Sequence, residues 1–313
     1  MAGVHQVLSE EDREILRDAV DLHVHSGPEC IPTKVDALDL AKQAMDFEMK
    51  AVVIKSHFTQ TSSWAVMASK FFGKRVYGSV TLNWDVGGIS PFPVRAALGP
   101  TYAGQPLLKT VWMPTLHSAH MIDMMKRQGA KEDIPRTWGG GARGGIPFEK
   151  IRGIVLDEYA TEMAAILDII AENKLVLATG HISPSEVVQL LDSARSHGVR
   201  NMILTHPTSP TTVGMSDEQI LECAGKGAYV EFCATTLVEH PEVFRQEIGR
   251  ITRLIHAIGP EHCILTSDLG RPHQPIPALG LLKLSKEILS VGISKMDLFK
   301  MIKTNPSHLL NLD

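Results

Sequence analysis

The feature that most constrains the fold is an alternation of short apolar runs with longer segments of helical periodicity. The runs are rich in β-branched residues, and eight are expected to be strands, over residues 19–25, 51–57, 76–83, 110–115, 175–181, 201–206, 228–232 and 263–268. Strands that alternate with helices are typical of βα units and a parallel sheet. Eight such units predict an α/β protein with a (β/α)₈ TIM-type barrel.

Helix starts support this pattern. Ser9, with Asp12 three residues on, is expected to cap a helix over about 9–20, and Ser183, with Glu186 three residues on, one over about 184–197. These are N-cap and capping-box spacings. A helix over about 35–48 is also predicted, with residues 38, 41 and 45 on its apolar face.

The alternation is interrupted between residues 84 and about 150. The segments 84–110 and 116–150 contain many glycines and prolines, including the run from Gly139 to Gly145. We expect them to be loop insertions over the carboxyl-terminal face of the barrel, within a single domain that spans residues 1–313.

Charge and cysteine content bear on the partners and the cellular compartment of the protein. The 313 residues carry a formal net charge of −4 without a basic stripe, so a nucleic-acid partner is not expected. The four cysteines form no CxxC pair, which favours free thiols in a reducing compartment. We see no signal-peptide pattern and no apolar run of about 18 residues, so a cytoplasmic protein is expected. The oligomeric state stays open, a homo-oligomer included.

Polar residues end four of the predicted strands. His23 and His25 end the first, His181 and His206 end the fifth and sixth, and Asp268 ends the eighth. Catalytic groups of such barrels lie at the carboxyl ends of the strands, and side chains two apart on a strand point to the same side. Imidazoles with a carboxylate suit a divalent transition metal, with zinc favoured over manganese, iron or nickel.

The order of these residues resembles the amidohydrolase superfamily. The segments that carry the resemblance are 21–25 (DLHVH), 179–181 (TGH), 204–207 (LTHP), 266–268 (TSD) and the ending 304–312 (TNPSHLLNL). The resemblance implies a metal-dependent hydrolase that cleaves an amide, cyclic amide, ester or lactone bond in a small-molecule substrate. In that family the strand-eight aspartate moves the proton of the attacking water, which implies this role for Asp268.

One position departs from the family pattern. A carboxylated lysine or a glutamate usually ends strand four, whereas here that strand ends at 113–117 (MPTLH). Lys55 and His57 instead end the second strand and share a face. Lys55 is expected to be a carboxylated metal ligand or a contact to a substrate carbonyl, and His57 a further ligand. The number of ions, one or two, stays open.

Other functions remain as alternatives. Residues 21–26 (DLHVHS) also resemble the first motif of PHP-type phosphoesterases, which implies phosphoester hydrolysis, and a barrel that binds metal or ligand without turnover is a third reading. Arg143, Trp84 and Trp112 are candidate substrate contacts, with surface or loop packing as the competing interpretation. Glu231 is expected to hydrogen-bond a ligand histidine.

Overall fold

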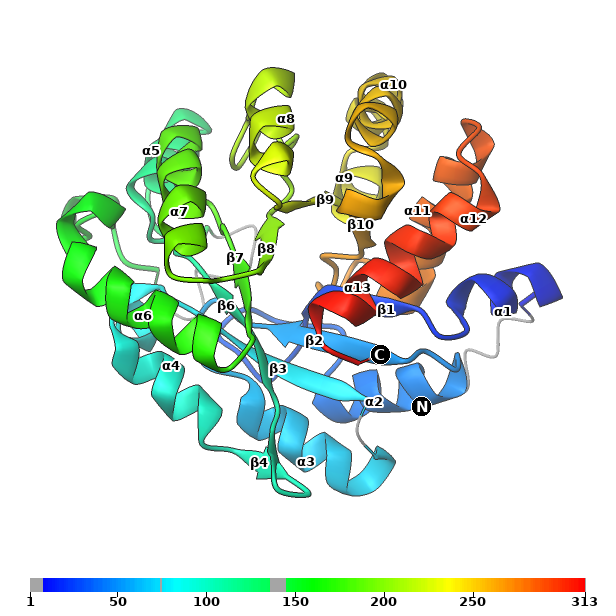
Figure 1. The fold of residues 1–313 in the computed structure, drawn as a ribbon, viewed down its shortest axis with the longest axis horizontal. Coiled ribbons are helices and arrows are strands. Elements are labelled where there is room, and N and C mark those ends of the chain that lie inside the picture. Colours follow the sequence, from blue (N-terminus) through cyan, green and yellow to red (C-terminus); the bar gives the residue numbers. More distant parts are fainter. Residues whose placement is uncertain (1–7, 74, 136–144, 313) are drawn as a thin grey trace.

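Eight parallel strands form the central sheet of the molecule (Figure 1). The computed structural model describes residues 8–73, 75–135 and 145–312. The strands follow one another in chain order as β1 (Val20–His25), β2 (Ala51–Lys55), β3 (Val76–Thr81), β6 (Leu108–Trp112), β7 (Val176–Ala178), β8 (Asn201–Leu204), β9 (Tyr229–Cys233) and β10 (Cys263–Thr266). All eight expected strands are therefore confirmed, each with an end shifted by a few residues at most.

The sheet closes on itself through the last residues of its first and last strands. The backbone N–H of Asp268 donates to the carbonyl of His23 at 2.8 Å, and that of His25 donates to the carbonyl of Leu269 at 2.9 Å. These bonds continue the ladder from β10 to β1 and complete a barrel, so the predicted (β/α)₈ fold is confirmed.

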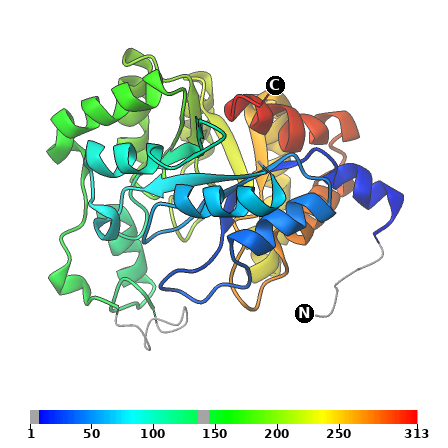
Figure 2. The ribbon, with the colours of Figure 1, turned by 90° about the horizontal axis from the view of Figure 1, so that it is seen from below.

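Helices surround the barrel on its outside (Figures 1 and 2). They are α1 (Glu10–Leu16), α2 (Ala37–Asp46), α3 (Ser62–Phe72), α4 (Pro91–Leu98), α5 (Ala119–Arg127), α6 (Ala160–Glu172), α7 (Pro184–Ser196), α8 (Asp217–Gly225), α9 (Ala234–Glu239), α10 (Pro241–Ile258), α11 (Pro277–Ser290), α12 (Lys295–Phe299) and α13 (Asn305–Leu309). Shorter turns are η1 (Trp84–Val86), η4 (Phe148–Lys150), η5 (Leu156–Tyr159), η6 (Pro260–His262) and η7 (Lys300–Thr304).

The predicted caps are present. The Ser9 hydroxyl accepts from the N–H of Asp12 at 3.1 Å, and Ser183 forms a complete capping box with Glu186. The buried face of α2 differs from the expectation: Leu40, Ala41 and Ala44 are buried, whereas residues 38 and 45 are exposed. α2 packs against both β2 and α3, and this contact decides which face is covered.

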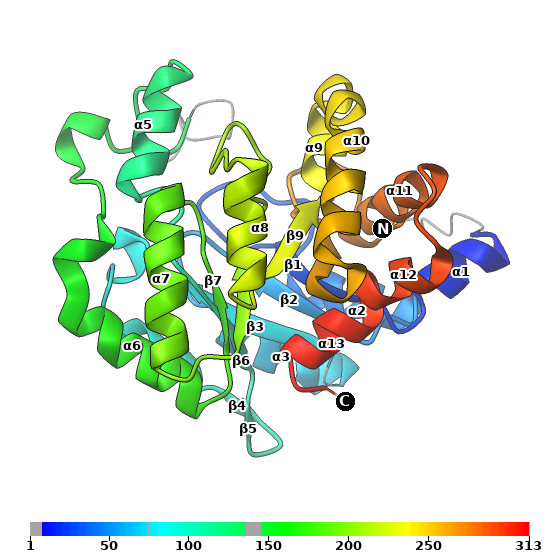
Figure 3. The ribbon, with the colours of Figure 1, turned by 45° about the horizontal axis from the view of Figure 1, so that its top comes forward.

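The segment 84–110 is not a long irregular loop. Its middle forms α4, which begins at the capping residue Ser90 and has Pro91 at its first turn. A short hairpin, β4 (Thr101–Tyr102) with β5 (Gln105–Pro106), follows and leads directly into β6. The hairpin therefore lies at the amino-terminal end of the barrel, opposite the expected face (Figure 3). A serine followed by proline is a helix-start signal that outweighs the local glycine content.

The described residues of the segment 116–150 follow the carboxyl end of β6. They include α5, capped by Ser118, and an antiparallel contact between Glu132 and Pro147. Most of the glycine run 139–145 lies outside the described residues. No helix in the described part of the chain is both long and apolar enough to cross a membrane.

Candidate metal centre

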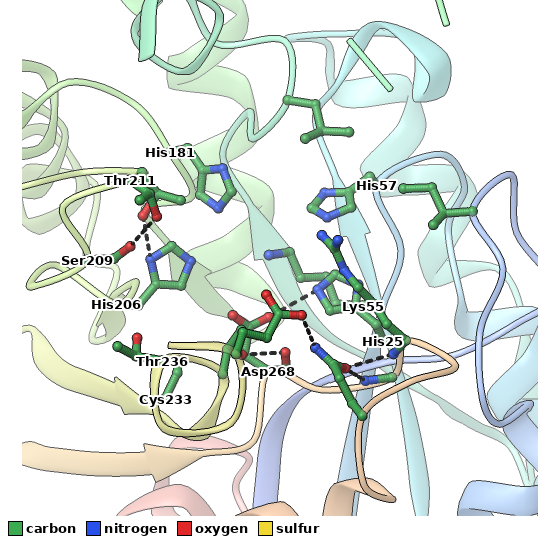
Figure 4. Close-up of a pocket in the computed structure, with 18 of the residues that line it drawn as sticks. His25, Lys55, His57, His181, His206, Ser209, Thr211, Cys233, Thr236 and Asp268 are labelled. Atoms are coloured by element: carbon green, nitrogen blue, oxygen red, sulfur yellow. Dashed lines mark hydrogen bonds and ion pairs between the residues drawn. The ribbon is translucent and has the colours of Figure 1, made fainter. Parts of the chain in front are cut away.

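Histidines, one lysine, one cysteine and one aspartate converge at the carboxyl ends of the strands (Figure 4). His25 and His57 have ring centroids 4.8 Å apart, and His181 and His206 have theirs 5.0 Å apart. The His23 ring lies 5.5 Å from that of His25. The structure thus brings the five predicted histidines together, although they come from four strands spread over the chain.

His23 is held from behind by a carboxylate. Its Nδ1 lies 3.1 Å from Oε1 of Glu231, and both side chains are completely buried. A carboxylate accepts hydrogen bonds, so Nδ1 carries a proton and Nε2 faces the centre. Burial alone would lower the pKa of His23, but Asp268 and Glu231 outweigh it and raise this pKa. The expected hydrogen bond between Glu231 and a candidate ligand histidine is present.

Asp268 lies between the two histidines of β1. Its Oδ1 is 3.0 Å from Nε2 of His23 and 3.1 Å from Nε2 of His25. Burial would raise the pKa of Asp268, yet the charge and hydrogen bonds of these histidines hold it well below its usual range. Asp268 also adopts a positive φ of 49°, a costly conformation that is common at functional sites.

Lys55 extends from β2 into the same centre. Its Nζ lies 2.9 Å from Nε2 of His23 and 4.6 Å from the centre of the Trp112 ring, and the side chain is almost completely buried. Burial lowers the pKa of Lys55, with partial compensation by Asp268 and Glu231. A buried amine with a lowered pKa exists more readily in its neutral, nucleophilic form.

His181 has unsatisfied ring nitrogens. Among the described residues, neither its Nδ1 nor its Nε2 has a hydrogen-bond partner, although the side chain is buried. Burial holds the pKa of His181 well below its usual value, so the ring is neutral with a free lone pair. The preceding Gly180 has a φ of +61°, and a Cβ there would collide with the carbonyl oxygens of Met113 and Pro114. Only glycine fits this turn, which aims His181 inward.

His57 and His206 each have a hydroxyl partner. Nδ1 of His57 lies 2.8 Å from Oγ1 of Thr115, and Nδ1 of His206 lies 3.1 Å from Oγ1 of Thr212. Burial lowers the pKa of both histidines, that of His57 to well below its usual value. Both rings are therefore neutral near pH 7.

Cys233 is a member of the cluster that the sequence did not reveal. Ligand atoms of His23, Cys233 and Asp268 all lie within 4.8 Å of one another. Cys233 ends β9 in the same way as the histidines follow their strands. Burial raises the pKa of its thiol well above the usual range, so without a cation the sulfur stays protonated.

The arrangement fits a divalent cation. Nε2 of His23 lies 2.9 Å from the Lys55 amine and 3.0 Å from the Asp268 carboxylate. Without a metal, a proton on Nε2 can bridge to the carboxylate, in agreement with the raised pKa of His23. A divalent cation can replace this proton, because it accepts the lone pairs of the nitrogen and the oxygen together. The unpartnered nitrogens of His181 point to the same conclusion. Nitrogen, oxygen and sulfur donors of this kind suit zinc and its neighbours.

Comparison with solved structures supports the barrel fold that carries the site. The phosphotriesterase homology protein from Escherichia coli, complexed with phosphate in its active site, has a TM-score of 0.59 at 13% identity, with 94% of this chain and 98% of that chain covered. An organophosphorus hydrolase from Deinococcus radiodurans has a TM-score of 0.56 at 13% identity, with coverages of 95% and 93%. A protein engineered for organophosphate hydrolysis from a weak promiscuous lactonase template has 0.55 at 14%, with coverages of 95% and 96%. The TIM barrel expected from the amidohydrolase resemblance is confirmed.

At the sequence level, residues 18–231 match the family model described as a family of unknown function, DUF6282. The chain belongs to this family. No curated protein matches the sequence.

The centre opens into a pocket of about 170 Å³ in this DUF6282 member. Its wall is mixed: Ile31, Pro32, Leu116 and Met121 lie beside Thr and Ser hydroxyls and charged groups. The polar lining residues beyond the metal cluster include Glu29, Thr33, Ser209, Thr211, Thr212, Thr235, Thr236, Glu239, Arg271 and Gln274. Burial raises the pKa of Glu29 to about 7 and lowers that of Arg271.

The predicted substrate contacts do not line this pocket. Trp112 is completely buried beneath Lys55 and His23, with its ring 4.6 Å from that of His23. Trp84 is partly exposed, and its Nε1 donates to the carbonyl of Arg152 at 2.8 Å. Trp112 is on a strand whose side chains fill the barrel, and Trp84 belongs to the rim beyond it. Arg143 lies outside the described residues.

Proposed function

We propose that this DUF6282 member is a metal-dependent hydrolase that cleaves an amide, cyclic amide, ester or lactone bond. The observation that carries the proposal is the pair formed by Nε2 of His23 and Oδ1 of Asp268, 3.0 Å apart, at the base of a pocket that Asp268 lines. The nitrogen lone pair of the neutral ring and this carboxylate are close enough to bind one cation together. Similarity in fold to phosphotriesterase-like hydrolases supports the same reaction class.

The ligands would come from the strand ends. His23, His25, His181, His206 and Asp268 would hold one or two ions, with zinc favoured over manganese, iron or nickel. Cys233 would add a thiolate, since coordination removes the proton of a thiol. When bound, such an ion lowers the pKa of a coordinated water and polarises a carbonyl or phosphoryl oxygen.

Asp268 would act as the proton carrier. Its lowered pKa keeps the carboxylate ionised at neutral pH, so it can accept the proton of the attacking water. The same oxygen then returns the proton to the leaving group. His25, within 3.1 Å of Asp268, keeps this carboxylate in place throughout.

Lys55 has two candidate roles. Its buried amine can add carbon dioxide, which forms an N–C bond, releases one proton and yields a carbamate whose oxygens would bind the cation. Alternatively, the amine contacts a substrate carbonyl. Under ¹³C-labelled bicarbonate, a carbamate carbon signal that is lost in Lys55→Gln supports the first role, and its absence from the metal-loaded wild type supports the second.

The pocket favours a small, polar substrate. Its volume of about 170 Å³ fits a small molecule, its Thr and Ser hydroxyls can hydrogen-bond to polar groups, and Arg271 offers a guanidinium for an anionic group. A phosphoester is the second candidate, since the structurally similar Escherichia coli protein holds phosphate in its active site. A barrel that binds metal without turnover is the third.

The deciding experiment is an assay of zinc- and manganese-loaded protein against lactones, cyclic amides, aryl esters and phosphate esters. Hydrolysis that requires the metal and is lost in Asp268→Asn supports the proposal. Turnover confined to phosphate esters favours the second candidate. Full metal occupancy without turnover of any class favours the third.

A further inference from the structure

A hydrogen-bond network outside the metal cluster determines which nitrogen of His57 carries a proton. The network runs from Asn83, which follows β3, through Thr115, which follows β6, to the His57 ring. Nδ2 of Asn83 lies 2.8 Å from Oγ1 of Thr115, and this Oγ1 lies 2.8 Å from Nδ1 of His57. All three side chains are buried, so each of these contacts has to satisfy hydrogen-bonding rules without help from bulk water.

The amide orientation of Asn83 is fixed by its backbone neighbours. Its Oδ1 accepts from the N–H groups of Thr115 at 2.8 Å and His117 at 3.3 Å. A backbone N–H can only donate, so this end of the amide must be the oxygen. The opposite end is therefore the NH₂ group, which donates to the carbonyl of His57 at 3.0 Å and to Oγ1 of Thr115.

The direction of the next bond follows. Oγ1 of Thr115 accepts from Asn83 and has a second lone pair, but its single proton still needs an acceptor, and within the described residues its other hydrogen-bond contact is the His57 ring. Nδ1 of His57 is at the right distance to be that acceptor. A neutral imidazole that accepts at Nδ1 carries its proton at Nε2. If the ring is instead protonated on both nitrogens, Nε2 still carries a proton.

His23 provides the contrast within the same site. Its Nδ1 faces the carboxylate of Glu231, which only accepts, so in the neutral ring that binds a metal Nε2 of His23 offers a lone pair. Nδ1 of His57 faces a donor, the Thr115 hydroxyl, whereas Nδ1 of His23 faces an acceptor, the Glu231 carboxylate. The two rings therefore present opposite chemistry to the pocket, a proton from His57 and a lone pair from His23.

We infer that His57 is not a metal ligand and that its Nε2–H donates a hydrogen bond to the substrate oxygen on which negative charge develops. This assignment rests on the proposed function and replaces the ligand role that we expected for His57. Its ring lines the pocket, 4.8 Å from the ring of His25 and 6.4 Å from that of His181, so an oxygen held near the cluster would lie within its reach. Preorganised donors of this kind typically contribute about 10²–10³-fold to kcat. Thr115 is then a positioning residue.

The first test measures the tautomer, which requires no substrate. Histidine-selective ¹⁵N labelling and two-bond ¹H–¹⁵N correlation identify the protonated nitrogen of each ring, with the His57 signals assigned through their loss in His57→Gln. We expect His57 to be protonated at Nε2 with and without zinc. In Thr115→Val, the Nδ1–H tautomer should gain population. A matched control is Thr110→Val, because the buried Thr110 hydroxyl has no hydrogen-bond partner among the described residues. An unprotonated, zinc-shifted Nε2 on His57 in the wild type would overturn the assignment.

The second test measures zinc and an oxyanion probe. His57→Gln, which keeps an N–H donor, and His57→Phe, which does not, should both hold as much zinc as the wild type. Inorganic phosphate should bind the zinc-loaded His57→Phe at least about tenfold more weakly than the wild type, with recovery in His57→Gln. Loss of zinc from His57→Gln would overturn the inference, as would equal phosphate affinity in the wild type and His57→Phe. Because neither test depends on turnover, failure here is distinguishable from failure of the hydrolase proposal.

Discussion

Nδ1 of His23 lies 3.1 Å from Oε1 of Glu231, and neither side chain is exposed to solvent. The same carboxylate accepts from the hydroxyl of Thr266 at 2.9 Å and from the N–H of His206 at 3.1 Å. Glu231 thus orients one candidate ligand by its side chain and another by its backbone. Its hydrogen bond also fixes the proton of His23 on the nitrogen that faces away from the pocket.

Glu231→Gln should weaken zinc binding by about 10–100-fold, as is typical when the hydrogen-bond partner of a ligand histidine is lost. An amide has one acceptor oxygen where the carboxylate has two, so it cannot satisfy all three donors. The measurement is a zinc titration against a competing chelator. Glu239→Gln is a matched control on the pocket rim and should leave the affinity unchanged. Equal affinities for the wild type and Glu231→Gln would contradict this role.

Replacing both His23 and His25 by Ala should remove most of the bound metal, because the variant loses both nitrogens that contact Asp268. Metal content by elemental analysis after dialysis is the measurement. The control pair is His240→Ala with His273→Ala, which removes two imidazoles from the region of the pocket rim without touching the strand ends. Full occupancy in the His23 and His25 double variant would show that the metal binds elsewhere.

The strand-end site could be predicted because topology alone assembles it. Each polar residue follows an apolar run, and the carboxyl ends of parallel strands meet on one face of a barrel. His23 and Asp268 are 245 positions apart in number, yet closure between β1 and β10 is required by the fold and puts them in contact. The site could therefore be predicted without knowing which individual side chains contact each other across the barrel.

The remaining features depend on contacts that leave no pattern in the sequence. The bond between His57 and Thr115 joins residues 58 positions apart and depends on the register of β2 against β3 and β6. Cys233 has no metal-binding spacing to neighbouring cysteines, and only its position at the end of β9 could have indicated it. For Trp112, residue type alone could not decide between packing inside the barrel and exposure at its mouth, and the structure shows packing.

The zinc-loaded protein should keep its metal at pH values below 6.5, the usual pKa of histidine. Burial lowers the pKa of His25 from 6.5 to about 4 and holds that of His181 well below its usual value. With these pKa values lowered, the rings of His25 and His181 stay neutral as pH falls through 6.5, so protons compete for His25 only as pH approaches 4. At His23, whose pKa is raised, this competition begins at higher pH, and the other ligands retain the metal. Dialysis of the zinc-loaded protein across this range, followed by elemental analysis, should show release with a midpoint well below pH 6.5. Circular dichroism at each pH separates release from acid unfolding, and a midpoint at or above 6.5 in folded protein would refute the expectation.

Asp268→Asn tests whether this carboxylate is a ligand alone or also a proton carrier. The amide keeps the shape and one oxygen donor but cannot accept a proton near neutral pH. Burial would raise the pKa of Asp268, but the charge of His23 and hydrogen bonds with His23 and His25 hold it well below its usual value, so the carboxylate is in its basic form near neutral pH. General acid–base groups contribute about 10²–10⁴-fold, so kcat should fall by about this factor while the metal is largely retained.

Metal content and turnover of Asp268→Asn have to be measured on the same sample, because lost metal also abolishes hydrolysis. Asp268→Ala, which removes the oxygen donor as well, serves as the comparison and should lose metal in addition to activity. Intact metal with near-normal turnover in Asp268→Asn would eliminate the proton-carrier role. Equal metal loss in both variants would instead show that the carboxylate acts chiefly as a ligand, and the contacts at 3.0 and 3.1 Å to the two histidines would then describe coordination geometry alone.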